Sequence, residues 1–174
     1  MDFEFDKNLS ISKTVVLDTK EVSGSDDFVF KFFIPNEFKN VVAIKSFTTC
    51  IDIPSTSSIA SSNLDVIYIY LNDFDNTDIA DISDSHSKPN IFSMIQHNYN
   101  NKVGTHIINS QDTIGTDDLR NDPNTYYANP LIHTISSFTV KLYKSDGTLF
   151  TKNDASRFVM KLAVYTSFGK KTIY

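Results

Sequence analysis

Residues 135–143 read ISSFTVKLY and residues 157–166 read RFVMKLAVYT, with Asp146 and Gly147 between the two stretches. In both stretches apolar and polar side chains alternate, which indicates a strand with one face in a core. The side chains expected to face that core are Phe138, Val140, Leu142, Phe158, Met160, Leu162 and Val164. The Asp-Gly pair favours a turn between the two strands. The C-terminal part therefore predicts two neighbouring antiparallel strands.

Six stretches upstream also have the character of strands. They are residues 9–17, 27–34, 39–53, 64–72, 90–98 and 104–109. Residues 27–34 place Phe28, Phe30, Phe32 and Ile34 on one face, whereas both faces of 64–72 are apolar or aromatic, so we expect that strand to be covered on both sides. Long loops are expected at 54–63, 72–90 and 110–130. The sequence thus predicts an all-β fold, a single jelly-roll β-sandwich of about eight antiparallel strands in one domain, 1–174.

Two prolines are expected to mark strand ends, because proline cannot donate to a ladder. Pro35 would stop the strand at 27–34, and Pro54 would close the strand at 39–53. No stretch has an apolar stripe of helical period and length. A short helix around Pro35–Phe38 or Leu119–Asn121 is compatible with the sequence.

Composition narrows the class of protein. The 174 residues include 14 Phe and 8 Tyr, types that fit a pleated sheet, and the formal net charge of -5 does not suit a nucleic-acid binder. The single cysteine, Cys50, excludes a disulfide within the chain and a thiolate metal cluster, and it is expected to be a small buried hydrophobe. With no signal-peptide pattern and no apolar run of about 18 residues, we expect a soluble protein made in the cytoplasm, without direct membrane insertion.

Two groups of residues are candidates for metal ligands. The acidic segment after residue 72 carries five aspartates, Asp73, Asp75, Asp78, Asp81 and Asp84. Asp73 and Asp75 have the first spacing of a calcium loop, but the glycine and the bidentate glutamate of an EF-hand are missing, so a solvated loop is favoured. The four histidines, His86, His97, His106 and His133, have no zinc-ligand spacing. The sequence therefore predicts no metal site and no cofactor.

Catalytic patterns are equally missing from the sequence. It contains no G-x-S-x-G nucleophile elbow, and its five scattered glycines form no phosphate-binding loop. We therefore expect no catalytic residues. Tyr99, Tyr126 and Tyr127 lie in expected loops, where they would serve in packing and protein contact or, alternatively, as a sugar-binding platform.

Two parts of the chain resemble a known family. The first runs FKFFIPNEFKNVVAIKSFTTCIDIPSTSSI and then LDVIYIYLNDFDN, with strands that end at Ile34-Pro35 and Ile53-Pro54. The second runs NPLIHTISSFTVKLYKSDGTLF and then RFVMKLAVYT. Together, over about residues 28–72 and 129–166, they resemble the small single jelly-roll capsid proteins of large icosahedral DNA viruses, the pentons and minor capsid proteins.

The resemblance implies a structural protein of the virion rather than an enzyme. A penton subunit of this family forms a homopentamer at the five-fold vertices and contacts the major capsid protein and other minor capsid proteins. A major subunit of this lineage needs two jelly rolls, and 174 residues hold one. We therefore expect a penton subunit, synthesised in the host cytoplasm and located in the capsid.

Three alternatives stay open at the level of sequence. A minor, or cement, capsid protein would use the same fold as a penton. A carbohydrate- or receptor-binding β-sandwich would use exposed aromatic and acidic residues, for which Tyr126, Tyr127 and Asp122 are candidates. A cupin-like enzyme would need clustered histidines and carboxylates on barrel strands, which the wide separation of the histidines disfavours.

Overall fold

Alternating apolar and polar residues form β-strands throughout the part of the chain that the computed structural model describes, residues 10–57, 66–74, 90–96, 104–109 and 125–167. The strands are β1 (Ser10–Asp18), β2 (Val29–Ile53), β3 (Val66–Leu71), β4 (Ser93–Gln96), β5 (Gly104–Asn109), β6 (Thr125–Tyr143) and β7 (Arg157–Ser167). The described residues contain no helix, so the all-β expectation is confirmed. In these same ranges, no helix is long and apolar enough to cross a membrane.

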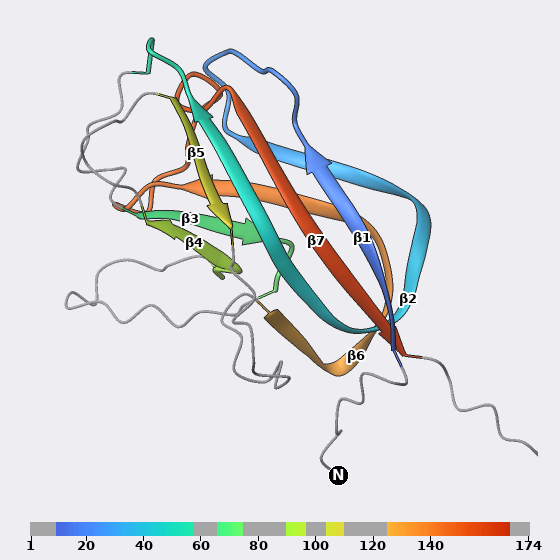
Figure 1. Ribbon diagram of the computed structural model, residues 1–174. Coiled ribbons are helices and arrows are strands. Elements are labelled where there is room, and N and C mark those ends of the chain that lie inside the picture. The colour runs from blue at the N-terminus through green and yellow to red at the C-terminus, as the bar shows by residue number, and fades with distance from the viewer. Residues whose placement is uncertain (1–9, 58–65, 75–89, 97–103, 110–124, 168–174) are drawn as a thin grey trace, which may run out of the picture.

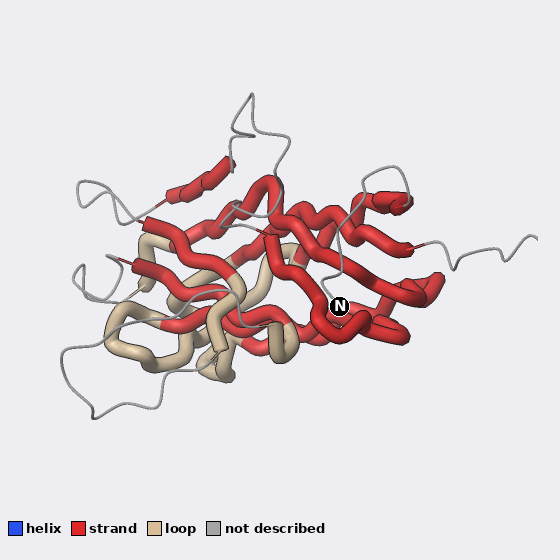
Figure 2. The backbone as a smooth tube through the Cα atoms, turned by 90° about the horizontal axis from the view of Figure 1, so that it is seen from below, coloured by secondary structure: helices blue, strands red, loops and turns tan. Residues whose placement is uncertain are grey.

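The strands pair antiparallel in two groups that share β2. In the first group, β1 pairs with β7, which pairs with residues 41–52 of β2, and β5 lies along residues 48–53. In the second, residues 29–41 of β2 pair with β6, followed by β3 and β4, and the start of β6, residues 125–127, also pairs with residues 43–45 of β2 beyond the bend. Because β2 and β6 bend, the sheet curls over and its strands lie in two layers (Figures 1 and 2). We call the first group layer one and the second layer two.

The long strand β2 differs from the sequence prediction. The expected strands 27–34 and 39–53 are one continuous strand, so the described residues form seven strands where about eight were expected. Pro35 does not stop β2, and Pro35–Phe38 is extended rather than helical. The reason is a bulge, in which residues 34–37 of β2 stand against Ser136 alone, between the pairs Phe33–Ser137 and Phe38–Ile135. Pro35 lies where the regular ladder is interrupted, so its missing N–H costs no ladder bond.

The core lies between the two layers. Its largest fully buried side chains are Phe28, Phe92, Phe138, Phe150, Phe158, Leu17, Ile44, Ile51, Ile53, Ile67 and Ile69. All seven C-terminal residues expected to face inward are fully buried, so that prediction is confirmed. Each buried phenylalanine contributes on the order of 2–3 kcal/mol relative to an exposed one. Contact between apolar side chains from both layers therefore holds the curled sheet closed.

The alternation predicted for β3 holds, but its outer face is only partly covered. Ile67, Ile69 and Leu71 are fully buried, whereas Tyr68 and Tyr70 on the opposite face are half-buried. The inner face of β3 is therefore covered as expected, whereas its outer face is covered only in part.

The connection from β6 to β7 is held by side chains that bond backbone groups. The expected turn is present, with Gly147 at φ 82° and its N–H donating to the Lys144 carbonyl at 2.9 Å. Further along, the buried Asp154 carboxylate accepts bonds from the N–H and hydroxyl of Thr151, both 2.9 Å, and pairs with Lys144 Nζ at 3.1 Å. Burial alone would raise the pKa of Asp154, but these bonds from Thr151 and Lys144 outweigh burial and lower it.

Replacing Phe138 by alanine should lower the free energy of unfolding by about 3–5 kcal/mol, because the fully buried ring lies between the layers. Urea denaturation of purified protein measures the change. Val16→Ala is the control, since that side chain is 61 % exposed on β1 and its loss should change stability by no more than about 0.5 kcal/mol. Equal effects of the two substitutions would contradict the assigned core.

Asp154→Asn should lower the free energy of unfolding by about 2 kcal/mol at pH 7, because an amide cannot replace the carboxylate's bond to Lys144. A carboxylate whose folded pKa is lowered stabilises the fold above its unfolded pKa of about 3.9, and this stability is lost as the pH falls through the folded value. The difference between wild type and variant should therefore shrink below about pH 4. Asp26→Asn, at an 81 % exposed side chain, is the control and should stay within about 0.5 kcal/mol at every pH. If the difference in unfolding free energy between wild type and Asp154→Asn is unchanged at pH 2, the ionised Asp154 carboxylate is not its source.

Candidate functional site

The structure describes only part of the predicted metal candidates. Asp73 follows β3, and its carboxylate accepts a bond from the Tyr70 hydroxyl at 2.8 Å; Asp75, Asp78, Asp81 and Asp84 lie outside the described residues. Of the histidines, His133 lies exposed on β6 and His106 is in β5, while His86 and His97 lie outside. Among the described residues, no three His, Cys, Asp or Glu side chains gather closely enough to hold a metal ion.

Cys50 is half-buried, so the prediction of a buried cysteine was wrong in degree. Its neighbours Ile51 and Ile53 take the core-facing positions of β2, and alternation turns Cys50 to the outer face of layer one. Desolvation, followed by the nearby charge of Asp52, raises the pKa of the Cys50 thiol. The thiol is therefore protonated at neutral pH.

The tyrosines expected in a loop lie in a strand. Residues 125–130, assigned to the third long loop, form the start of β6, and Tyr126 and Tyr127 pair with Ile44 and Ala43 of β2. The Tyr126 ring stacks on Phe74, with centroids 4.9 Å apart and planes at 29°. Both tyrosines are half-buried, which leaves less ring surface for a sugar platform than a loop would. Tyr99 and Asp122 lie outside the described residues.

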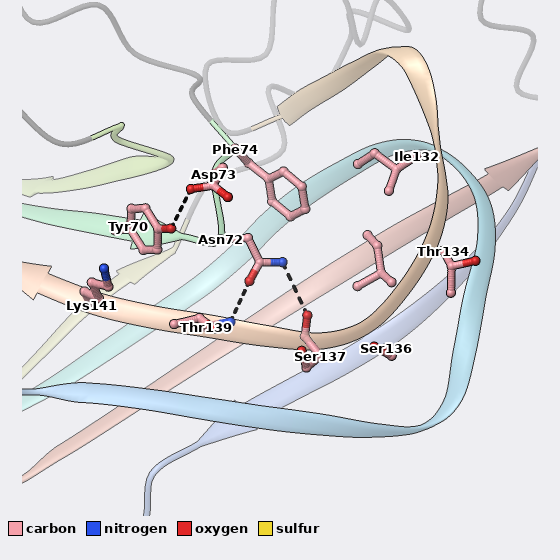
Figure 3. A pocket seen from close by; sticks show the side chains of 11 residues that line it. Tyr70, Asn72, Asp73, Phe74, Ile132, Thr134, Ser136, Ser137, Thr139 and Lys141 are labelled. Carbon is pink, nitrogen blue, oxygen red and sulfur yellow. Dashed lines mark hydrogen bonds between the residues drawn. The ribbon is translucent and has the colours of Figure 1, made fainter.

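A shallow hollow of about 410 Å³ opens between the end of β3 and the bend of β6 (Figure 3). Its lining comes from Tyr70, Asn72, Asp73, Phe74, Ile132, Thr134, Ile135, Ser136, Ser137, Thr139 and Lys141. These side chains mix apolar surface with hydroxyls, one amide, one carboxylate and one amine. Among the described residues that line the hollow none is a histidine or a cysteine, and together they offer contacts to polar and apolar groups.

Asn72, one of the residues that line the hollow, joins the end of β3 to β6. Its side chain accepts a bond from the Thr139 N–H at 2.6 Å and donates to the Ser137 carbonyl at 3.3 Å, while its own N–H donates to the Thr139 carbonyl at 2.8 Å (Figure 3). The residue has φ 50°, in the left-handed region that asparagine tolerates better than most residues. The Asn72 amide thus continues the β3–β6 ladder past the point where the strand itself ends.

Tyr70 stands at one side of the hollow between two charges. Its hydroxyl donates to Asp73, and Lys141 Nζ lies 4.6 Å from the centre of its ring. Desolvation, and then the bond to Asp73, raise the pKa of Tyr70 to about 12. The phenol is therefore neutral at physiological pH and acts as a fixed donor and a flat apolar surface.

The hollow lies at the edge of a larger surface, which we call the outer face of layer two. Directly opposed residues of an antiparallel ladder point to the same side. The registers therefore place on one face Val29, Lys31 and Phe33 of β2, Ser137, Thr139, Lys141 and Tyr143 of β6, Tyr68 and Tyr70 of β3, and Met94 of β4. These residues alternate with the core positions of the same four strands.

This face holds three of the four exposed large hydrophobic side chains found among the described residues. Phe33 is 77 % exposed, Met94 47 % and Val29 40 %; the fourth, Val16 at 61 %, lies on β1. Single exposed apolar residues are ordinary, but a concentration on one sheet face beside half-buried tyrosines is typical of an interaction surface. Its chemistry therefore suits contact with another macromolecular surface.

Sequence reasoning did not single out this face, although its signal was present. In ISSFTVKLY, in VIYIYL and in DFVFKFFI, the positions that alternate with the core residues carry Lys, Tyr, Val and Phe instead of uniformly polar side chains. What the sequence could not supply is the order of strands that brings these positions together.

Asn72→Ala should lower the free energy of unfolding by about 2 kcal/mol. It removes two side-chain bonds to β6, and it puts alanine, which tolerates the left-handed region less well than asparagine, at a positive φ. Asn72→Gly separates the two causes, since it relieves the backbone strain while losing the bonds. Chemical denaturation should rank the wild type above Asn72→Gly and Asn72→Gly above Asn72→Ala. If Asn72→Ala has the same free energy of unfolding as the wild type, the Asn72 amide does not hold β3 and β6 together.

In comparisons with known proteins, neither a protein-family model nor a curated protein matches this chain.

Proposed function

We propose that this chain is a structural capsid protein, the penton subunit that forms a homopentamer at the five-fold vertices of an icosahedral double-stranded DNA virus. The observation that carries the proposal is the outer face of layer two, with Val29, Phe33 and Met94 exposed beside half-buried tyrosines. A protein whose role is to be covered by neighbours keeps such apolar area on its surface. In the virion, the neighbours are further copies, the major capsid protein and other minor capsid proteins.

The pairing order supports the finer fold that this role requires. If β2 is divided at its bulge and counted twice, the seven strands become eight: layer one has the chain order 1-8-3-6 and layer two the order 2-7-4-5. This order is the one expected of a jelly roll, in which strands from the two ends of the chain pair in both layers. The proposal therefore includes a single jelly-roll domain, with β2 supplying two of its strands.

The strand edges give such a domain several places for contact. β1 pairs only with β7, β4 pairs only with β3, and residues 29–33 of β2 pair only with β6 among the described residues. Unpaired strand edges bind neighbouring chains readily. An interface that is repeated through a closing rotation produces a ring, as a penton requires.

Two alternatives use the same observations differently. A minor capsid protein would cover the same face against capsomers rather than against copies of itself. A carbohydrate- or receptor-binding β-sandwich would use the hollow beside Tyr70, where a neutral phenol, Lys141 and Asp73 offer donors, an acceptor and a flat ring. Binding to a glycan array, weakened by Tyr70→Ala, would favour the last alternative.

Native mass spectrometry of the purified protein should give a species of five times the 19.7 kDa chain mass. Phe33→Asp should weaken this pentamer, because it places a charge in apolar contact area, whereas Lys161→Asp on the outer face of layer one should not. A reconstruction of the virus particle then locates the chain. Density for it away from the five-fold vertices would contradict the penton role while leaving the capsid role intact.

A further inference from the structure

The first half of β2 leaves one edge of layer two open. Residues 29–33 pair with residues 137–141 of β6, and no described strand pairs with their other edge. By contrast, residues 41–52 of the same strand pair with β7, and residues 48–53 with β5 as well. The open edge is therefore local to the part of β2 in layer two.

The backbone groups of Lys31 point toward this open edge. On β6, opposite Lys31, Thr139 gives both its N–H and its carbonyl to Asn72, on the β3 side. The pair Lys31–Thr139 is therefore one of the non-hydrogen-bonded pairs of the ladder. Because the N–H and the carbonyl of a strand residue point to the same side, those of Lys31 face away from β6 and can bond an added strand.

The core is incompletely covered along the same edge. Phe28 is fully buried, but Phe30, Phe32 and Ile34, which share its face, are only partly buried against the core. On the outer face Lys31 is exposed, with its Nζ 5.3 Å from the centre of the Phe33 ring. A strand added here would therefore meet aromatic surface on its inner side and a positive charge on its outer side.

A segment with this complementary pattern occurs in the chain itself. Residues 2–6 read DFEFD. Since side chains of a strand alternate between faces, an extended DFEFD would present Phe3 and Phe5 on one face and Asp2, Glu4 and Asp6 on the other. The two phenylalanines match the inner side of the open edge, and the three acids match Lys31 on its outer side.

We propose that residues 2–6 of one copy add as a β-strand to the open edge of β2, residues 29–33, in a second copy. Phe3 and Phe5 then complete the cover over Phe30 and Phe32, and the acidic residues lie beside Lys31. This inference rests on the proposed assembly role and specifies how neighbouring copies are joined.

A second copy fits better than the same chain. Ser10, the first residue of β1, pairs with Ser167, and the neighbouring Thr166 pairs with Val41, so β1 begins beside the bend of β2 in layer one. To return to layer two of its own domain, the chain must cross roughly 10 Å between layers and reverse its direction. The four steps from residue 6 to residue 10 span at most about 14 Å when fully extended, so crossing between the layers leaves a single residue for the turn, too few to reverse the chain.

Disulfide trapping between two full-length variants tests the proposal. Both carry Cys50→Ser; one adds Lys31→Cys, and the other adds Asp2→Cys, Glu4→Cys or Asp6→Cys. Residues opposed across such a pair lie about 5.5 Å apart at Cα, within reach of a disulfide. After mixing and mild oxidation, at least one acidic-face variant should form a covalent heterodimer with Lys31→Cys.

Matched controls come from the same segment and from the other layer. Phe5→Cys should not couple to Lys31→Cys, because its side chain would face the core side of the added strand. Glu4→Cys should not couple to Lys161→Cys, which is exposed on the outer face of layer one. Equal coupling by all variants would reflect random collision and would overturn the proposal.

Charge reversal gives an independent readout without cysteines. Lys31→Glu, and separately the triple substitution Asp2→Lys, Glu4→Lys and Asp6→Lys, should each weaken self-association about tenfold, measured by sedimentation equilibrium. Combining the two sets in one chain should restore it. Thermal unfolding followed by circular dichroism verifies that each variant is folded.

The outcomes separate this inference from the penton role. A pentamer that withstands both charge reversals and yields no disulfide overturns the strand addition and leaves the penton role standing. Specific trapping in an assembly that is not a pentamer supports the strand addition and overturns the penton role. If a disulfide forms only when Lys31→Cys and Glu4→Cys are placed on one chain, and then only within that chain, the exchange between copies is overturned.

Discussion

β2 belongs to both layers, and the rest of the fold depends on this. Residues 29–45 of β2 pair with β6, residues 41–52 with β7 and residues 48–53 with β5, so the strand fixes the position of each layer relative to the other. The bulge at residues 34–37 and the positive φ of Asn40 accompany the change of direction between them. Once β2 is bent, Phe28 and Ile44 reach the same core from different layers. The hydrophobic contact that closes the sandwich therefore requires the bend.

The same arrangement determines which surfaces are left for other molecules. β6 follows β2 around the bend as far as residues 43–45, whereas β7 pairs with β2 only from Val41 onward, so residues 29–33 keep a single neighbour while residues 48–52 have two. The open edge and the exposed Phe33 thus follow from the geometry that builds the core. Asn72 and the hollow beside it show the same effect at β3, where a side chain replaces backbone pairing at a strand end.

Several parts of this structure followed from local sequence, and others did not. The core positions of β6 and β7 were predicted, because alternation over eight or more residues leaves one choice of inner face. The continuity of β2 through Pro35 was not predicted, because the rule that proline ends a strand assumes a regular ladder. Tyr126 and Tyr127 were assigned to a loop, because residues 110–130 are polar and the pairing partners at Ile44 and Ala43 lie more than 80 residues away in the sequence.

The sequence by itself determined the all-β class, the inner face of each clear strand and the turn at Asp146–Gly147, since these depend on neighbours two residues apart or on the conformational freedom of one glycine. Only the tertiary structure decided that β2 is one strand, that Cys50 faces outward, and that Val29, Phe33 and Met94 share a face. These features depend on which strands lie side by side. Strand order is set by the packing of the whole core, which no short stretch of sequence contains.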